Sequence, residues 1–317
     1  MPELPEVETI VRQLSPLVSG CVLARVEVLD PRWSAPLSPA ALARALGGRR
    51  IRSLTRRGKY IVWDLHDGLH LVQHLRMSAV LLYRPDGEPR HVRVRMQLQG
   101  GPGEAGGDLG AGPGGGRRGV ASLVVCDPRR FGTAQLVHGA DELERFFAAR
   151  LGLEPFDPAF TAEHLRALVR PRRTAIKALL LDQRSVAGVG NIYADEALFR
   201  ARIHPARGAG GLTLAQCREL RAGLIEALEA GIDARGASID DFRHVDGVRG
   251  TFQERFLVHR RAGERCPRCE GTVEKLVVAG RGTYVCPRCQ PAPRRSAARR
   301  RRGGGGPPPG RPPARPL

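Results

Sequence analysis

Apolar residues in the first part of this chain recur with the period of β-strands. In residues 22–29 (VLARVEVL), apolar and polar positions alternate. Similar runs follow at 59–65, 69–75, 79–83, 91–98 and 120–126. A period of two is typical of strands that bury one face. The pattern therefore predicts a β-rich sandwich or barrel in the N-terminal part of the chain.

Helical periodicity flanks these strands and takes over after about residue 140. Residues 5–18 form an amphipathic pattern, and 38–46 (SPAALARAL) offer Ser38 as a cap and Pro39 at the first helical position. After DELERFFAAR, further helices are predicted near 161–169, 174–182, 191–201 and 213–230. Thr213 and Gln216 form a capping box for the last of these, and Gly231 is predicted to end it. We expect an α+β, multi-domain protein.

Changes in composition divide the chain further. Residues 100–119 contain eleven glycines in twenty positions, so we expect a disordered insertion between two strands. Residues 291–317 hold eight arginines and no acid, and we expect a disordered basic tail. The predicted divisions are a β-rich N-terminal domain at 1–138, a linker at 139–160, a helical domain at 161–250, a cysteine-rich module at 251–290 and the tail at 291–317.

The net charge is +19, of which the tail supplies +8 and the remaining body +11. A basic body favours a polyanionic partner such as nucleic acid. Aromatic residues make up only 5%, which argues against a surface that mainly stacks single-stranded bases. The chain lacks an eighteen-residue apolar run and a secretion signal, so we expect a cytoplasmic protein with no membrane partner.

Four of the seven cysteines form two CPRC knuckles, at 266–269 and 286–289. Sixteen residues separate Cys269 from Cys286, a spacing typical of a structural zinc site. We predict one Zn²⁺ held by Cys266, Cys269, Cys286 and Cys289, with a β-hairpin between the knuckles. The remaining thiols, Cys21, Cys126 and Cys217, are interpreted as buried small hydrophobic residues.

The first residues, MPELPEVETI, have two interpretations. Pro5 and Glu6 suit the first turn of a helix, because Pro needs no amide hydrogen there and Glu favours the positive end of the dipole. That reading leaves Pro2 and Glu3 unexplained. A chemical role for Pro2 and its neighbouring acids therefore stays open on local grounds.

Seven motifs in one order resolve this choice. They are PELPEVET at the start, GKY at 58–60, HLRMS at 74–78, DPRRFG at 127–132, TAIK at 174–177, GVGNIYADE at 188–196 and the four-cysteine finger. Together they resemble the bacterial formamidopyrimidine-DNA glycosylase family, over residues 2–290.

The resemblance implies an N-terminal β-sandwich with flanking helices, a central helical domain with a helix–two-turn–helix, and a C-terminal β-hairpin zinc finger. It implies a bifunctional DNA glycosylase and AP lyase that excises 8-oxoguanine and formamidopyrimidines through a proline Schiff base and β,δ-elimination. The partner is then double-stranded DNA with an oxidised base, bound by a monomer at the nucleoid.

The resemblance also assigns catalytic roles. Pro2 is the nucleophile once Met1 is removed, and an α-amino group, with a pKa of about 8, is far more often neutral at physiological pH than a lysine. Glu3 is the general acid and base, and Glu6 positions both residues. Lys59 contacts a phosphate at the lesion, whereas a lone lysine there otherwise reads as a solvated strand end.

Further residues are matched to DNA contacts. Met77, Arg129 and Phe131 fill the gap left by the flipped nucleotide. Without the family context, Met77 and Phe131 read as core residues.

Asn191 and Arg281 hold phosphates beside the lesion together with Lys59. Residues 236–250 correspond to the loop that closes over the base, with Ser238 near the pocket.

The sequence departs from the family pattern at the 100–119 insertion, the tail and Arg76, which replaces a glycine of some relatives. Two other functions remain open. One is an endonuclease VIII-type glycosylase for oxidised pyrimidines, although that branch typically begins Pro-Glu-Gly-Pro. The other is a non-catalytic zinc-finger DNA-binding protein.

Overall fold

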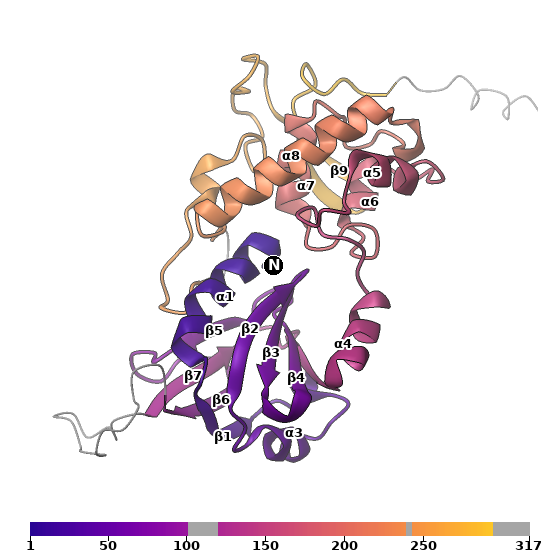
Figure 1. Ribbon diagram of the computed structural model, residues 1–317. Coiled ribbons are helices and arrows are strands. Elements are labelled where there is room, and N and C mark those ends of the chain that lie inside the picture. Colours follow the sequence, from indigo (N-terminus) through magenta and orange to yellow (C-terminus); the bar gives the residue numbers. More distant parts are fainter. Residues whose placement is uncertain (101–119, 239–242, 294–317) are drawn as a thin grey trace, which may run out of the picture.

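The computed structural model describes residues 1–100, 120–238 and 243–293. All but the first residue of the predicted glycine-rich insertion, four residues of the predicted closing loop and nearly all of the basic tail therefore lie outside the described residues. The described chain forms two lobes with the N-terminus between them (Figure 1). The lower lobe in this view holds the large sheets, and the upper lobe holds the helices of the second half of the chain and a β-hairpin.

The lower lobe is a sandwich of two four-stranded antiparallel sheets, of order β1-β6-β7-β5 and β2-β3-β4-β8. The first sheet consists of β1 (Val22–Val28), β6 (Val92–Gln99), β7 (Val120–Cys126) and β5 (Val80–Tyr83). The second consists of β2 (Ile51–Arg57), β3 (Tyr60–Leu65), β4 (Leu69–His74) and β8 (Thr133–His138). The predicted β-rich domain is thus a sandwich. Gln99 pairs with Val120, so the residues between them connect neighbouring strands.

Two strands of this sandwich were not predicted, β2 and β8. In β2, buried and exposed positions do not alternate, because only Ile51 and Leu54 are buried among basic and polar residues. β2 and β8 lie at the edges of their sheet, where each has one neighbouring strand and needs less apolar surface. Their hydrophobic signal is correspondingly weak.

Helix α1 (Leu4–Val18) connects the two lobes (Figure 1). Val7, Ile10 and Leu14 belong to the sandwich core, whereas Leu4 belongs to the core of the helical lobe. The first turn of α1 is therefore fixed by both lobes. Three other helices accompany the sandwich: α2 (Pro31–Ser34), α3 (Pro39–Leu46) and α4 (Gly139–Ala148). Ser38 caps α3 as predicted, because its side chain accepts the Ala41 amide.

The helical lobe contains the four predicted helices. They are α5 (Ala162–Val169), α6 (Ile176–Leu181), α7 (Asn191–Arg200) and α8 (Leu214–Asp233). Short 3₁₀ turns lie at His66–Gly68 in the sandwich lobe and at Ala209–Gly211 and Phe252–Arg255 later in the chain. The predicted capping box of α8 is present. The predicted end at Gly231 is wrong, since α8 continues to Asp233. A Cβ at Gly231 would lie 2.5 Å from the Tyr193 ring, so this glycine permits close packing of α8 against α7.

The predicted hairpin between the cysteine knuckles is present as β9 (Glu274–Val278) and β10 (Arg281–Val285). Cys21, Cys126 and Cys217 are buried, as predicted. No helix in the described part of the chain combines the length and the apolar character needed to cross a membrane.

Candidate active site and metal centre

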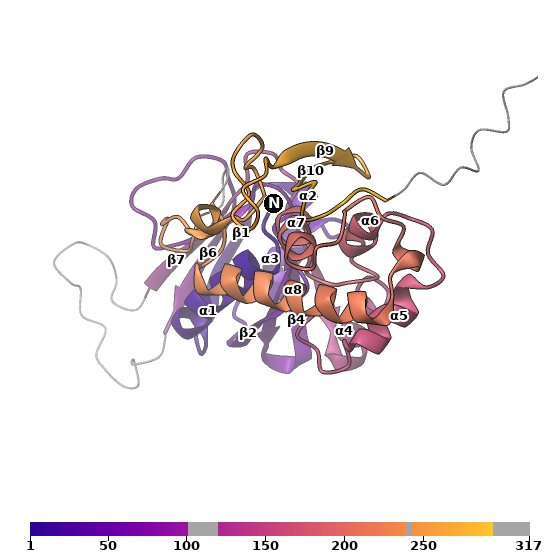
Figure 2. The ribbon, with the colours of Figure 1, turned by 90° about the horizontal axis from the view of Figure 1, so that it is seen from above.

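Met1 and Pro2 line a cavity of about 230 Å³ between the two lobes. Seen from above, the N-terminus lies close to α7 and the hairpin β9–β10, whose residues line the same cavity (Figure 2). Its lining comes from both lobes and includes the start of α1, the β2–β3 turn, the start of α7 and the hairpin β9–β10. The lining includes the predicted residues Pro2, Glu3, Glu6, Lys59, Met77, Asn191 and Arg281. Arg129, Phe131 and Ser238 do not line this cavity.

Glu3 places its carboxylate at the N-terminus of α7. Its two oxygens accept the backbone amides of Ile192 at 3.0 Å and Tyr193 at 3.4 Å. Unpaired amides and the helix dipole favour a negative charge at this end of a helix. The contact requires Gly190, because a Cβ there would lie 2.3 Å from the Glu3 carboxyl carbon. The GVG sequence thus gives the Glu3 carboxylate access to the helix end.

Glu6 lies one helical turn further on and is 1% exposed. Its carboxylate accepts three hydrogen bonds: from the Glu3 amide, the Tyr193 hydroxyl and the Ala237 amide, each at 2.8 Å. Burial, reinforced by the nearby Glu3 carboxylate, raises the pKa of Glu6, and the hydrogen bonds oppose this increase. Glu6 therefore connects α1 to α7 and to the start of the predicted closing loop.

Lys59 follows β2 in the tight turn to β3 and is 4% exposed. It is therefore not a solvated strand end. Burial lowers its pKa, while the charges of Glu3 and Glu6 act in the opposite direction and Arg281 lowers it further. A buried cation beside two carboxylates and an arginine is well placed to meet an anionic group of a ligand.

Pro2 is buried at the edge of the same cavity, and Met1 is 45% exposed beside it. While Met1 is attached, the Pro2 nitrogen is an amide and has no nucleophilic lone pair. Met1 also lines a second cavity, of about 470 Å³, together with Met77 and Phe131. Removal of Met1 would free the amine and open the space between the two cavities.

Met77 and Phe131 are 38% and 48% exposed, so neither is a core residue. The Arg129 guanidinium lies over the Phe131 ring, 4.8 Å from its centroid. All three residues lie on loops at the end of the sandwich that faces the cavities. Exposed apolar side chains at such a rim are suited to insertion between bases.

The hairpin β9–β10 is fixed to the helical lobe by a buried ion pair that sequence reasoning did not single out. Lys177 and Asp195 are both fully buried, with Nζ and Oδ1 2.6 Å apart. Lys177 also donates to the Thr283 hydroxyl and to the Gly282 carbonyl, and Asn191 donates to the same carbonyl at 3.1 Å. TAIK supplied the signal, because a lysine in an apolar helical segment needs a buried partner.

Ser238 is buried beside Ala237, which lines the cavity. Its hydroxyl accepts the Gly250 amide at 2.9 Å, and its amide donates to Gln253. These bonds join the two ends of the segment 238–250, part of which lies outside the described residues.

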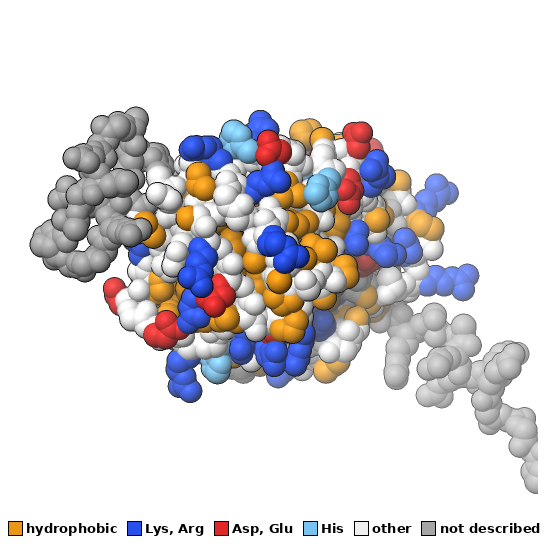
Figure 3. All heavy atoms as spheres, turned by 90° about the horizontal axis from the view of Figure 1, so that it is seen from below, with side chains coloured by type: hydrophobic (Ala, Val, Ile, Leu, Met, Phe, Trp, Pro, Cys, Tyr) orange, Lys and Arg blue, Asp and Glu red, His pale blue; other side chains and the backbone are white. Residues whose placement is uncertain are grey.

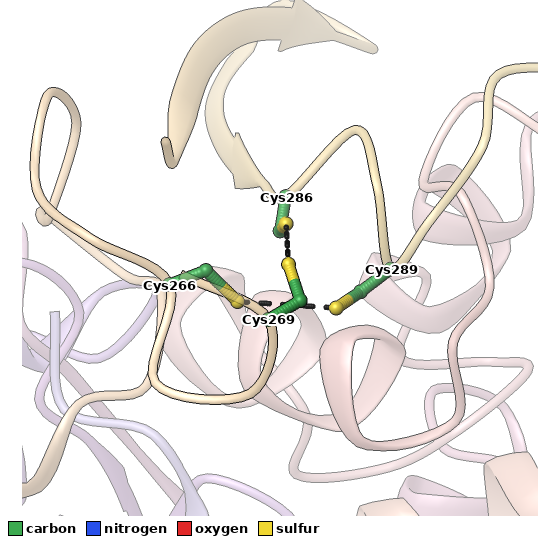
Figure 4. Close-up of side chains that lie close together, drawn as sticks. All are labelled: Cys266, Cys269, Cys286 and Cys289. Atoms are coloured by element: carbon green, nitrogen blue, oxygen red, sulfur yellow. Dashed lines mark hydrogen bonds between the residues drawn. The ribbon is translucent and has the colours of Figure 1, made fainter. Parts of the chain in front are cut away.

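The four predicted cysteines converge on one point (Figure 4). All four sulfurs lie within 4.8 Å of one another, with Cys269 and Cys286 3.4 Å apart and Cys266 and Cys289 3.9 Å apart. A tetrahedral Zn²⁺ with bonds of about 2.3 Å requires sulfurs about 3.8 Å apart. The cluster therefore fits one structural zinc ion, and its four thiolates leave no open coordination position.

Basic side chains are not confined to one surface. The face seen from below in Figure 3, at the far end of the sandwich, shows Lys and Arg dispersed among acidic and apolar side chains. The net charge alone therefore does not locate the site, and the location rests on the residues around the cavity.

Three family models match successive parts of the chain. They describe the formamidopyrimidine-DNA glycosylase N-terminal domain (residues 1–134), the formamidopyrimidine-DNA glycosylase H2TH domain (151–243) and a zinc finger found in FPG and IleRS (263–292).

Similar proteins and structures extend over nearly the whole chain. Formamidopyrimidine-DNA glycosylases of Desulfitobacterium hafniense and Methylobacterium sp. are 39% and 42% identical, over 92% of this chain and 100% of each relative. The solved complex of Lactococcus lactis Fpg with DNA containing an abasic site has a TM-score of 0.79 and 32% identity, over 92% of this chain and 100% of that one. A complex of the same enzyme with DNA containing an oxidised pyrimidine gives the same values.

Proposed function

Because this chain belongs to the formamidopyrimidine-DNA glycosylase family, which consists of base-excision repair glycosylases with AP-lyase activity, we propose that Pro2 performs both reactions on oxidised purines in duplex DNA. The main support is the position of the N-terminal segment, whose Pro2, Glu3 and Glu6 share one cavity with Lys59. Four Cys ligands would hold zinc away from this chemistry, in a structural role.

Base removal begins with the free secondary amine of Pro2. Its lone pair attacks C1′ of the deoxyribose, the glycosidic bond breaks, and the bonding electrons leave with the base, which takes up a proton from solvent. The Pro2 nitrogen passes its own N–H proton to the Glu3 carboxylate. Glu3 then protonates the sugar ring oxygen as the C1′–O4′ bond opens, leaving an iminium cation between Pro2 and C1′. Amides at the start of α7 hold the Glu3 carboxylate in place for this transfer.

Strand cleavage follows from the iminium cation, which acidifies the hydrogens on C2′. Loss of one such proton expels the 3′ phosphate, and a second elimination expels the 5′ phosphate. Lys59 and Arg281 line the cavity as cations and are suited to bind these phosphates. Asn191 is the first residue of α7, and a helix N-terminus favours the binding of phosphate oxygens.

Access to C1′ requires that the damaged nucleotide leaves the helix stack. Met77 and Phe131 are exposed apolar groups suited to fill the space it leaves, and Arg129 is suited to hydrogen-bond the unpaired base opposite. The partner is thus double-stranded DNA, with the protein acting as a monomer.

Borohydride trapping tests this proposal. Protein lacking Met1 is incubated with a duplex containing 8-oxoguanine opposite cytosine, borohydride is added, and mass spectrometry locates the adduct. We expect an adduct on Pro2 and strand cleavage, and both are lost in Pro2→Gly and in protein that retains Met1. Pro16→Gly is the matched control, because Pro16 lies at the exposed end of the same helix.

Three outcomes would overturn the proposal. They are an adduct on another side chain, full turnover by protein that retains Met1, and binding without cleavage. A parallel duplex with oxidised thymine tests the substrate class, and faster excision there than at 8-oxoguanine would favour the pyrimidine alternative.

A further inference from the structure

Two loops carry the residues proposed to fill the DNA gap, and both cross between the sheets of the sandwich. Residues 75–79 connect β4 to β5, and residues 127–132 connect β7 to β8. β4 pairs with β8 in one sheet, with His74 opposite Thr133, while β5 pairs with β7 in the other, with Val80 opposite Cys126. The two crossings therefore lie side by side at one end of the sandwich.

A single buried carboxylate organises the second crossing. Asp127 is 1% exposed, and its Oδ2 accepts the amides of Phe131 at 2.9 Å and Gly132 at 2.8 Å. Its Oδ1 accepts the Arg129 amide at 3.2 Å. These bonds fix the backbone on both sides of Arg130, which has a φ of 59° and whose guanidinium is bound to Asp30. Arg129 and Phe131 are thereby left facing outward.

The same carboxylate reaches the first crossing. Ser78, which is 3% exposed, donates its hydroxyl to Asp127 Oδ1 at 2.5 Å. Ser78 directly follows Met77. Among the described residues, the bonds within the first crossing are short-range, from the Arg76 amide to His74 Nδ1 and from the Ala79 amide to the Leu75 carbonyl. The Ser78–Asp127 hydrogen bond thus joins Met77 to the Arg129–Phe131 loop.

We propose that Asp127 and Ser78 are positioning residues that couple the two loops, so that Met77, Arg129 and Phe131 enter the DNA as one unit. Neither residue lines the catalytic cavity, and both act through their exposed neighbours. A hydrogen bond to a buried carboxylate is strong enough to hold two loops in one arrangement. This inference rests on the gap-filling role proposed above for Met77, Arg129 and Phe131.

The test is a double-mutant cycle of Ser78→Ala with Met77→Ala. Single-turnover excision of 8-oxoguanine is measured together with a fluorescent base analogue beside the lesion that reports unstacking. We expect Ser78→Ala to lower the rates of excision and of unstacking about tenfold, the loss expected for one hydrogen bond to a charged group. In protein that already carries Met77→Ala, the Ser78→Ala substitution should have little further effect, because the side chain that Ser78 positions is already absent.

Two further variants separate positioning from folding. Ser122→Ala is the matched control, because Ser122 is an exposed serine on β7 that pairs with Gln97, outside both loops. Asp127→Asn should slow unstacking at least as much as Ser78→Ala, since both carboxylate oxygens of Asp127 accept hydrogen bonds and an asparagine amide has only one accepting oxygen. Thermal melting of each variant shows whether it folds. If Asp127→Asn does not fold, the Ser78→Ala result still tests the proposal.

The outcomes distinguish the two proposals. If Met77→Ala leaves excision and unstacking unchanged, the proposed gap-filling role is wrong. If Met77→Ala slows both but Ser78→Ala does not, the coupling is wrong. Equal slowing by Ser78→Ala in both backgrounds would also overturn the coupling, because additive effects mean that Ser78 acts independently of Met77.

Discussion

Two neighbouring carboxylates at the start of α1, those of Glu3 and Glu6, lie in different environments. Glu3 accepts amides at a helix N-terminus and lines the cavity, whereas Glu6 is enclosed and its pKa is raised by burial. Environments that separate two acids in this way are typical of sites where one exchanges protons and the other holds the geometry. This division agrees with the roles proposed for Glu3 and Glu6.

His74 provides a pH-dependent prediction at the residue scale. Burial lowers its pKa to about 3, reinforced by Arg76 and Lys59, and its Nδ1 accepts the Arg76 amide. The folded state therefore favours the neutral ring, and its stabilising effect, fully present above about pH 6.5, is lost as the pH falls from about 6.5 towards about 3. Between about pH 7.5 and about pH 5, His74 should account for about 2 kcal/mol of lost unfolding free energy.

Urea unfolding of wild type and His74→Asn at both pH values checks this. The variant keeps an acceptor for the Arg76 amide but has no titrating ring, so its stability should fall less on acidification. His66→Asn controls for the loss of an imidazole at an exposed position. Equal loss of stability in His74→Asn and wild type would contradict the prediction.

At the scale of elements, helix propensity and side-chain packing make opposite predictions for a substitution of Gly231. Replacing glycine by alanine inside a helix normally stabilises it by about 1 kcal/mol. Here a Cβ would lie 2.5 Å from the Tyr193 hydroxyl, which donates to Glu6. We therefore expect Gly231→Ala to lower the free energy of unfolding by about 1–3 kcal/mol, as overpacking does.

Chemical denaturation measures this change, with Ala222→Gly as the propensity control, because Ala222 is an exposed position of α8. Stabilisation by Gly231→Ala would mean that Tyr193 moves aside without cost. In that case the packing explanation for this glycine fails.

Helices and strands differed in how far sequence could predict them. The caps of α3 and α8 are local, since Ser38 and Thr213 bond to residues three positions away, and both were predicted. The edge strands β2 and β8 were missed because each buries only two residues, so their hydrophobic pattern is weak. The continuation of α8 past Gly231 was missed because the reason lies in α7.

At the scale of the whole molecule, the hairpin β9–β10 reaches the cavity only because it is held at both ends. The cysteine cluster closes one end, and the buried Lys177–Asp195 pair anchors the other through Thr283 and Gly282. A hairpin of two five-residue strands is too small to keep this arrangement alone.

Zinc removal should therefore weaken DNA binding. Without the metal the hairpin loses its closed end, so Arg281 and the Gly282 carbonyl, which Asn191 binds, are no longer held at the cavity. We expect the Kd for a duplex with an abasic-site analogue to rise at least about tenfold, the loss of one or two charged contacts. Fluorescence anisotropy before and after chelation measures it, and added zinc should restore binding.

A variant pair gives the same test without a chelator. Cys269→Ser should lose metal and affinity, while Cys126→Ser, a buried cysteine outside the cluster, should keep both. Unchanged affinity after complete metal loss would show that the hairpin does not depend on zinc.

The sequence by itself determined the helix caps, most strands, the four zinc ligands and, through the order of its motifs, the family to which they point. These depend on residue type and spacing along the chain. Only the tertiary structure decided which residues share a cavity, that Glu6 and Lys59 are buried, that Lys177 pairs with Asp195, and that Asp127 joins two loops. Those features arise from contacts between residues 18 to 231 positions apart, such as Lys177 with Asp195 and Glu6 with Ala237. Burial and pairing at such separations depend on how the lobes pack, which no local pattern encodes.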